Sequence, residues 1–292
     1  MSLLPMRSLT RFFGVALCVA LLGGCASVAN PAGPEGDWVE KWLALPVSSG
    51  SELTVAVIDG GVLDHPTLDD RVVGGWEAEY TAGGLRTSHA TEMAGLVLGV
   101  SGADDTSITT GIRILDVRVL DSKGSGTPAD IATGIRWAVA NRADLLLMSM
   151  SISINDRGLE AAVAEAVAAG VTIVASTTNG FSESRSYPAE YPGVIGVTSV
   201  SSSLALAPLA GLRGADIAAP GEQVMAPSSG HGFRSISGTS VAAATAASVI
   251  AACRGVWGLD ESGVIAYAKD SGAKVASDRH SIPVLRCLTK EK

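Results

Sequence analysis

The chain has few basic residues, few cysteines and only a short apolar stretch at its start. Its 292 residues include 21 lysines and arginines against 29 aspartates and glutamates, which gives a net charge of −8. Nucleic-acid-binding surfaces need clustered positive charge, so this balance argues against nucleic acid as a partner. The four cysteines and four histidines show none of the spacings that hold zinc. The apolar stretch is too short to span a bilayer as a helix.

Charged residues are scarce as well, at 17% of the chain, whereas hydrophobic residues make up 47%. This composition excludes global disorder and supplies a sizeable core. The length suits one large α/β domain with short appendages. The sequence shows no internal repeat and no linker long enough to divide the domain. We expect a single domain over residues 51–292, preceded by a tether and lead-in over residues 26–50 that is rich in turn-forming residues.

Residues 1–25 resemble a bacterial lipoprotein signal peptide. Arg7 and Arg11 precede the apolar stretch FFGVALCVALLGG, which ends directly before Cys25. The resemblance implies that Cys25 is acylated, becomes the mature N-terminus and anchors an exported protein to the membrane of the bacterial cell envelope, on its periplasmic or extracellular face. The alternative is an ordinary signal peptide that is cut nearby, with Cys25 incidental.

Two further cysteines lie in the expected domain. Of the other two, Cys18 leaves with the signal peptide and Cys25 is the candidate for acylation. Cys253 and Cys287 form an even pair, which predicts a disulfide in an exported, oxidising setting. Two separate buried thiols are an almost equally good interpretation.

Short apolar runs without regular polar alternation recur along the domain, and helical patterns separate them. Such runs fit strands that are buried on both faces, as in a parallel sheet. Their alternation with helices predicts a three-layer αβα fold with a mainly parallel central sheet. The expected strands are LTVAVID, IRILDVRVL, ADLLLMSMSI, VTIVAST, GVIGVTSV and ADIAAP. The expected helices are SHATEMAGLVLGV, TPADIATGIRWAVANR, GLEAAVAEAVAAG, TSVAAATAASVIAACRG and ESGVIAYAKDSG.

Four side chains with the chemistry for amide hydrolysis lie at the ends of these elements, where functional residues of such folds gather. The reaction needs a nucleophile, a base, a group that orients the base, and donors for the oxyanion. Asp59 ends a strand, His89 lies at a helix start, Asn179 follows a strand and Ser240 opens a helix. Alone, each has a plain structural explanation in a turn, a helix start or close packing. The order Asp, His, Ser along the chain is that of subtilisin.

The stretches around these residues resemble the motifs of the subtilases, the subtilisin-like serine peptidases. VAVIDGGVLDHPTL resembles the aspartate motif, SHATEMAG the histidine motif and SGTSVAA the serine motif. The likeness covers nearly everything from Leu53 to the C-terminus. It implies a subtilisin-like fold with a catalytic triad, in which His89 takes the proton of Ser240 and Asp59 holds the imidazole. The Asn179 amide and the Ser240 backbone N–H would then receive the oxyanion.

The resemblance also implies a set of substrate-binding residues. Gly124-Ser125-Gly126 and Ser151-Ile152-Ser153 match two extended segments that pair with the substrate backbone in the family. Thr178 and Ser153 stand where the family usually has glycine, and Ser186 matches a position at the base of the pocket and carries no charge. We expect a narrowed pocket that favours small, uncharged residues before the cut bond.

Several positions depart from the family pattern without removing a member of the triad. Ala90 replaces a glycine, Glu92 stands where a second histidine is common, and Ala244 replaces a proline. Asp104 and Asp105 lie where some relatives carry a calcium loop, but the asparagine-rich spacing is missing, and a solvated acidic turn is the better interpretation. We therefore expect no metal site and no required cofactor.

Two further expectations follow from the resemblance. The Tyr187–Pro188 bond is cis in relatives, and a plain trans turn is the alternative. Many secreted subtilases carry a prodomain of several tens of residues, for which residues 26–51 are too few. We therefore expect the domain to fold without a cleaved prodomain.

The leading hypothesis is a monomeric, membrane-tethered serine endopeptidase that acts on peptides or proteins outside the cytoplasm. An esterase of the α/β-hydrolase type is disfavoured, because the Gly-x-Ser-x-Gly elbow is absent around Ser240 and the order of the residues differs. The alternative is a catalytically inactive, subtilase-like lipoprotein that binds peptides or a protein partner.

Overall fold

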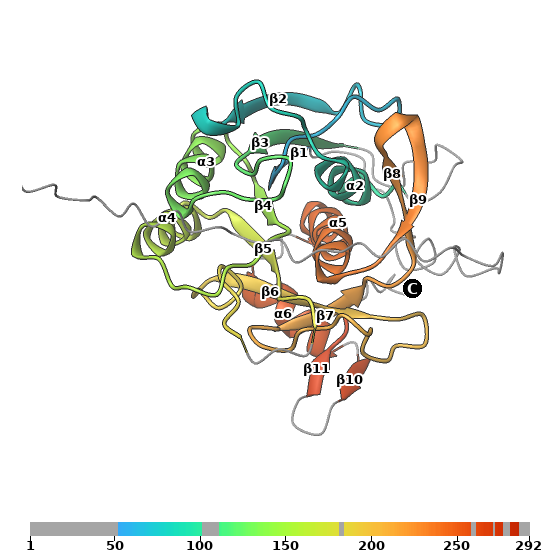
Figure 1. Cartoon of the computed structure of the whole chain (residues 1–292). Coiled ribbons are helices and arrows are strands. Elements are labelled where there is room, and N and C mark those ends of the chain that lie inside the picture. The colour runs from blue at the N-terminus through green and yellow to red at the C-terminus, as the bar shows by residue number, and fades with distance from the viewer. Residues whose placement is uncertain are drawn as a thin grey trace, which may run out of the picture.

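A parallel sheet of seven strands forms the centre of the molecule (Figure 1). The computed structural model describes residues 52–100, 111–180, 184–257, 261–270, 272–276 and 281–285. Neighbouring strands follow the order β2-β3-β1-β4-β5-β6-β7, and every pairing between them is parallel. The strands are β1 (Leu53–Asp59), β2 (Val72–Glu77), β3 (Ile112–Arg118), β4 (Leu145–Met148), β5 (Thr172–Ser176), β6 (Val194–Val200) and β7 (Ile217–Pro220).

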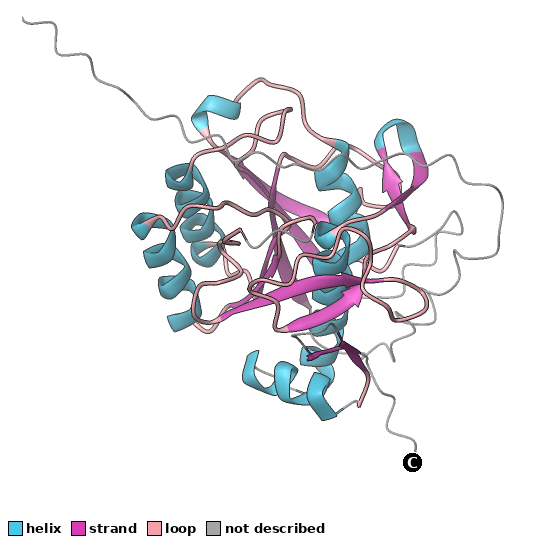
Figure 2. Ribbon diagram, turned by 60° about the horizontal axis from the view of Figure 1, so that its bottom comes forward, coloured by secondary structure: helices cyan, strands magenta, loops and turns pink. Residues whose placement is uncertain are grey.

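Helices cover both faces of this sheet (Figure 1, Figure 2). α2 (Ser88–Val97) and α5 (Thr239–Trp257) pack together on one face. α3 (Pro128–Ala140) and α4 (Arg157–Ala168) pack together on the other, and α6 (Glu261–Asp270) contacts β6. The expected three-layer fold with a parallel sheet is confirmed.

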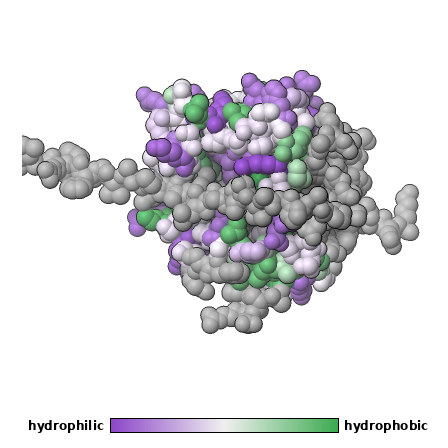
Figure 3. Space-filling view, turned by 45° about the vertical axis from the view of Figure 1, so that its right-hand side comes forward, coloured by the Kyte–Doolittle hydropathy of each residue, from purple (hydrophilic) through white to green (hydrophobic). Residues whose placement is uncertain are grey.

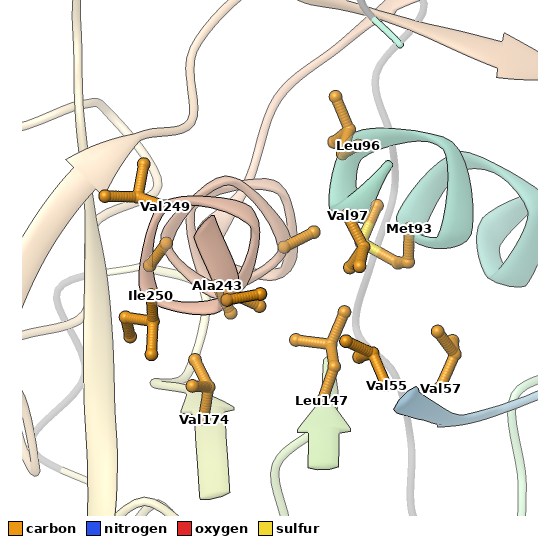
Figure 4. Close-up of a cluster of buried hydrophobic side chains, with 14 of the residues drawn as sticks. Val55, Val57, Met93, Leu96, Val97, Leu147, Val174, Ala243, Val249 and Ile250 are labelled. Carbon is orange, nitrogen blue, oxygen red and sulfur yellow. The ribbon is translucent and has the colours of Figure 1, made fainter. Parts of the chain in front are cut away.

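The environment of β1 explains why its sequence is apolar throughout. Val55 and Val57 face α2 and α5, where they join a core that includes Met93 (Figure 4). Ala56 and Ile58 belong to the cluster on the opposite face, under α3 and α4. Successive strand residues point to opposite faces, so a strand covered on both sides needs an apolar residue at every position. Full burial of each valine or isoleucine stabilises the fold by roughly 1.5–3 kcal/mol.

Polar side chains determine where the helices begin. Thr87 caps α2 and accepts a hydrogen bond from the N–H of Ala90, which makes His89 the second residue of the helix. Thr127 caps α3 and Asp156 caps α4 in the same manner. These caps satisfy N–H groups that the first turn of a helix leaves without partners.

One strand and two hairpins lie outside the expected elements. β2 is an edge strand that contains Gly74 and Gly75 and is largely exposed. β8 (Val224–Ser228) and β9 (Gly232–Ile236) form an antiparallel hairpin whose first strand packs on α2 and whose second runs towards α5 (Figure 1). β10 (Lys274–Ala276) and β11 (Ser281–Pro283) form the second hairpin.

Large apolar side chains are exposed at scattered positions of the described surface, namely Val73, Tyr80, Leu85 and Ile154. On the face drawn in Figure 3, hydrophilic and hydrophobic side chains alternate among the described residues. Single exposed apolar side chains of this kind are normal for a globular protein. No described helix combines the length and the apolar character that a membrane crossing requires.

The contact between Gly95 of α2 and the ring of Pro227 in β8 generates a test of the packing. A Cβ at residue 95 would lie 2.1 Å from Cγ of Pro227. Alanine ordinarily stabilises a helix relative to glycine by about 0.5–1 kcal/mol, whereas overpacking costs roughly 1–3 kcal/mol. Because the proline ring is rigid, we expect Gly95→Ala to lower the free energy of unfolding by about 1–2 kcal/mol in urea denaturation.

The matched control is Gly232→Ala, in the hairpin that packs on the same helix. A Cβ at residue 232 meets no atom within 4 Å, so its stability should stay unchanged. A Gly95→Ala protein as stable as the unmodified chain would show that helix propensity outweighs the clash.

Candidate active site

Asp59 and His89 meet at the edge of the sheet where the parallel strands end. Asp59 is the last residue of β1, and His89 is the second residue of α2. Nδ1 of His89 lies 2.8 Å from Oδ2 of Asp59, and Oδ1 of Asp59 accepts from the N–H of Gly60 over 2.6 Å. The Asp59 side chain is buried, whereas the imidazole is 20% exposed. The ring therefore has one nitrogen on the carboxylate and part of its surface open to solvent.

The hydrogen bond to Asp59 determines the tautomer of His89. A carboxylate only accepts, so the neutral ring carries its proton on Nδ1 and leaves Nε2 as the basic nitrogen. Burial opposes the charged imidazole, but the negative charges nearby, above all the hydrogen-bonded Asp59 carboxylate, together outweigh burial and raise the pKa of His89 above its ordinary value of 6.5. Glu92 adds to this increase and Arg234 opposes it. The site thus holds a base whose cation has a fixed anionic partner.

Ser240 is the second residue of α5, which lies beside α2 on the same face of the sheet (Figure 1). Its Oγ donates to the carbonyl of Ser149 over 3.0 Å, and Oγ of Ser149 donates to the carbonyl of Ser240 over 3.3 Å. Ser149 directly follows β4, the neighbour of β1. The hydroxyl therefore lies at the same edge of the sheet as the Asp59–His89 pair, but its hydrogen bond is made to Ser149.

Asn179 is held in place by the first residue of α5. Its Oδ1 accepts from the backbone N–H of Thr239 over 3.0 Å, and the Thr239 hydroxyl lies 3.0 Å from the same oxygen while it donates its proton to the carbonyl of Thr177 over 2.6 Å. Since a backbone N–H only donates, Oδ1 is the atom that faces Thr239, and the amide NH₂ is directed away from it. The N–H of Ser240 belongs to the first helical turn and has no acceptor within the helix. Both donors suit an anionic oxygen at this helix N-terminus.

The residue before Thr239 needs to be a glycine. Gly238 has a φ of 152°, which a residue with a side chain rarely adopts. A Cβ there would also lie 3.3 Å from Oδ1 of Asn179. The close approach of the backbone to Asn179 therefore depends on the missing side chain.

An ion pair between a buried carboxylate and a partly exposed arginine supports the loop that leads into α2. Asp116 of β3 accepts from the N–H of Val62 over 3.1 Å and pairs with Arg86. Burial raises the pKa of Asp116, although Arg86 opposes the increase. Because Arg86 lies three residues before His89, this pair ties the approach to the base to the central sheet.

The two segments expected to pair with substrate are hydrogen-bonded within the protein. In Gly124-Ser125-Gly126, the N–H of Ser125 donates to the carboxylate of Asp121 over 2.9 Å. The carbonyl of Ser125 accepts from the N–H of Asp121 and the hydroxyl of Tyr80. In Ser151-Ile152-Ser153, both main-chain groups of Ile152 pair with Tyr187. These bonds occupy the main-chain groups of Ser125 and Ile152, and the expected pairing of the two segments with the substrate backbone stays a prediction.

Two of the residues expected to shape the pocket have buried hydroxyls. Oγ1 of Thr178 and Oγ of Ser186 are buried, and neither has a hydrogen-bond partner among the described residues. Ser153, in contrast, is exposed. The Tyr187–Pro188 bond that follows Ser186 is cis, as the resemblance implied. Thr178 and Ser186 thus bring small, uncharged polar groups into the protein interior.

Several expected sites fall outside the described residues. These are the lipidation at Cys25, the acidic stretch with Asp104 and Asp105, and the Cys253–Cys287 disulfide, of which neither thiol is described. Where side chains are described, no group of three or more His, Cys, Asp or Glu is placed to hold a metal ion.

Comparisons with known proteins identify the family. Residues 50–256 match the Subtilase family. The chain belongs to the subtilase family. It is 34% identical over 223 residues to the thermophilic serine proteinase of Bacillus sp. (strain AK1), and the alignment covers 72% of this chain and 54% of that protein. It is 32% identical over 210 residues to thermitase of Thermoactinomyces vulgaris, and this alignment covers 68% of this chain and 74% of that protein.

Solved structures show the same subtilase fold. The crystal structure of a cold adapted subtilisin-like serine proteinase matches with a TM-score of 0.74 at 24% sequence identity. The match covers 88% of this chain and 100% of that chain. The chain spans about half the length of several curated subtilases that it resembles.

Sequence reasoning missed two residues that form hydrogen bonds with candidate active-site residues. Ser149 bonds Ser240, and Thr239 orients Asn179. The position of Ser149 directly after β4 was a usable signal, because functional residues gather at the carboxyl ends of parallel strands. The role of Thr239 depends on a contact between distant segments, which the sequence alone does not show.

The raised pKa of His89 predicts how the loss of Asp59 depends on pH. A group whose pKa is raised on folding stabilises the native state fully below its unfolded value, here 6.5, and this contribution is lost as the pH rises through the folded pKa. We expect Asp59→Asn, made in a Ser240→Ala background to prevent self-digestion, to lower the free energy of unfolding more at pH 5 than at pH 9. Urea denaturation at the two pH values measures the difference.

The control is Glu165→Gln, which removes an ion pair with Arg136 on the surface of α3 and α4, across the sheet. Its effect on stability should be the same at both pH values. An equal effect of Asp59→Asn at pH 5 and pH 9 would contradict the assigned pairing with His89.

Proposed function

We propose that this subtilase is a serine endopeptidase that hydrolyses peptide bonds with Asp59, His89 and Ser240. The observation that carries the proposal is the 2.8 Å hydrogen bond between Nδ1 of His89 and Asp59, at the edge of the sheet where Ser240 opens α5. This bond orients Nε2 as the base and stabilises the cation that forms when the base takes a proton. Membership of the subtilase family supports peptides and proteins as the substrates.

In the proposed reaction, rotation about χ1 of Ser240 releases Oγ from the carbonyl of Ser149. Oγ then bonds to the scissile carbonyl carbon while its proton passes to Nε2 of His89, and the oxyanion accepts from the Asn179 amide and the Ser240 N–H. The imidazolium protonates the leaving amine, the C–N bond breaks and an acyl-enzyme forms. Water attacks this ester with the same base, which releases the acid and restores Ser240.

We also propose a preference for small, uncharged residues before the cut bond. Thr178 carries a side chain where glycine is usual, and Ser186 is fully buried and uncharged. The N–H of Ser186 donates to Glu190 over 2.7 Å, and Glu190 is paired with both Arg185 and Arg213. The nearby carboxylate therefore already has cationic partners, which argues against a site for a basic side chain.

The proposal further places the enzyme outside the cytoplasm, as a monomer held on the cell envelope by a lipid on Cys25. The support for this part is the sequence of the first 25 residues alone. More than one acyl chain on Cys25 would make the attachment stable, since a single chain binds membranes only marginally.

An inactive, peptide-binding subtilase is the second candidate, and one observation favours it. The Ser240 hydroxyl is hydrogen-bonded to Ser149 and not to His89, so proton transfer first requires a rotation of the side chain. A test of serine reactivity separates the two candidates.

A fluorophosphonate probe, which reacts with activated serines, supplies that test. We expect the unmodified protein to be labelled and Ser240→Ala to remain unlabelled. Peptide hydrolysis should fall by about 10⁶-fold in Ser240→Ala, the loss known for the catalytic serine of subtilisin. Ser248→Ala, a buried serine further along α5, is the control that keeps full labelling. An unmodified protein that resists the probe would establish the inactive alternative.

Digestion of a peptide library tests the proposed specificity. We expect cleavage mainly after small, uncharged residues such as alanine and serine, because Thr178 and Ser186 offer neither room nor charge for longer side chains. Mass spectrometry of the products identifies the residue before each cut, and Thr178→Gly should widen the range towards larger residues. Cleavage mainly after Phe, Tyr, Lys or Arg in the unmodified protein would refute the preference.

A further inference from the structure

Glu92 is a fully buried carboxylate that lies one helical turn after His89 in α2. Its exposed fraction is 0%, and residues three apart in a helix share one face. The subtilase motif that this stretch resembles commonly has a histidine at this position, whereas this chain has an acid. A buried carboxylate persists only where partners compensate its lost hydration.

The partners of Glu92 come from the β8–β9 hairpin. Oε1 accepts from Nε of Arg234 over 2.7 Å, lies 2.7 Å from Nη2 of the same side chain, and accepts from Oγ of Ser228 over 3.1 Å. Oε2 has no hydrogen-bond partner in the described part of the chain. The hairpin therefore clamps the carboxylate by one oxygen, and the other oxygen is buried without a donor among the described residues.

The same hairpin leads into the nucleophile. β9 ends at Ile236, and Ser240 opens α5 shortly after it (Figure 1). Glu92 therefore joins the helix that carries the base to the strand that delivers the hydroxyl. A movement of one of these segments would break the contact with the other.

Glu92 is also the second carboxylate that acts on the base. Burial lowers the pKa of His89, Asp59 and then Glu92 raise it, and Arg234 lowers it. β8 and the described side chains of α5, the other elements packed on α2, carry no ionisable group. Two more histidines lie at the hairpin, since His231 belongs to the turn between β8 and β9, and Nε2 of His65 lies 3.3 Å from the carbonyl oxygen of Gly232.

We propose that Glu92 is a positioning residue for His89. Its carboxylate, clamped by Arg234 and Ser228, is a fixed negative charge one helical turn from His89 and links α2 to the hairpin that leads into α5. The inference rests on the proposed function, because it assigns Glu92 a role through the base of that reaction. Arg234 determines how much of the charge acts on the ring.

The test is an NMR titration of the His89 ring in the full chain with Ser240→Ala, in which the signal is assigned by its loss in His89→Gln. We expect Glu92→Gln, which keeps the shape and removes the charge, to lower the midpoint by about 0.5–1 pH unit. In the protein with Ser240 intact, the acid limb of the kcat/KM profile should move to lower pH by the same amount. Glu165→Gln is the matched control and should leave both midpoints unchanged.

A second variant covers the case in which Glu92→Gln fails to fold. Glu92→Gln with Arg234→Gln removes both charges and leaves no unpaired ion, and it should shift the midpoint in the same direction by less, because Glu92 acts on His89 more strongly than Arg234 does. A midpoint that stays in place or rises in either variant overturns the inference. This outcome differs from failure of the proposed function, in which the unmodified protein neither binds the fluorophosphonate nor hydrolyses peptides while the titration still reports on Glu92.

Discussion

The close packing of α2 against α5 is the constraint on which the rest of the structure depends. The two helices carry the base and the hydroxyl, and they pack together in one core cluster that includes the small buried side chains of Ala94 and Ala243. Figure 4 shows Ala243 of α5 in this cluster together with Met93 and Val97 of α2. Helix axes approach closely only where small residues line the contact. Both helices begin at the edge where the parallel strands end, so this packing brings the first turns of α2 and α5, with His89 and Ser240, to the same edge of the sheet. The small residues of α5 are therefore as necessary for the site as the polar ones.

The layers of the fold were predictable because burial on both faces leaves a strong mark on the sequence. Strands such as β1 and β4 need an apolar residue at every position, and they stood out for that reason. β2 did not, because an exposed edge strand with two glycines buries few apolar side chains and so lacks an apolar pattern. Backbone pairing with β3 holds this strand in the sheet. The β8–β9 hairpin was missed for a similar reason, since it depends on its contact with α2 and not on an apolar pattern of its own.

The sequence predicts candidate-site residues where the chemistry requires one residue type. It does not predict contacts that depend on a partner far away in the chain. Asp59, His89 and Asn179 stand at element ends, where the chemistry needs an acid, a base and an amide. The structure places His89 on Asp59 at the end of β1 and Asn179 beside the start of α5. The hydrogen-bond partners of the main chain at Ser125 and Ile152 were not predictable in this way. Whether a loop carbonyl is open depends on residues far along the chain, here Tyr80 and Tyr187, and no local pattern reports such contacts.

Two ion pairs near α2 share one arrangement, in which a buried carboxylate is paired with a partly exposed arginine. Asp116 and Glu92 are buried or nearly so, whereas their partners Arg86 and Arg234 are 40% and 41% exposed. Water screens a half-exposed cation more than it screens a buried anion, so equal formal charges do not cancel inside the protein. At His89, Asp59 and Glu92 raise the pKa, Arg234 lowers it, and the resulting pKa lies above the ordinary value. An imidazolium at residue 89 therefore gains from its two carboxylates, and the half-exposed Arg234 reduces that gain.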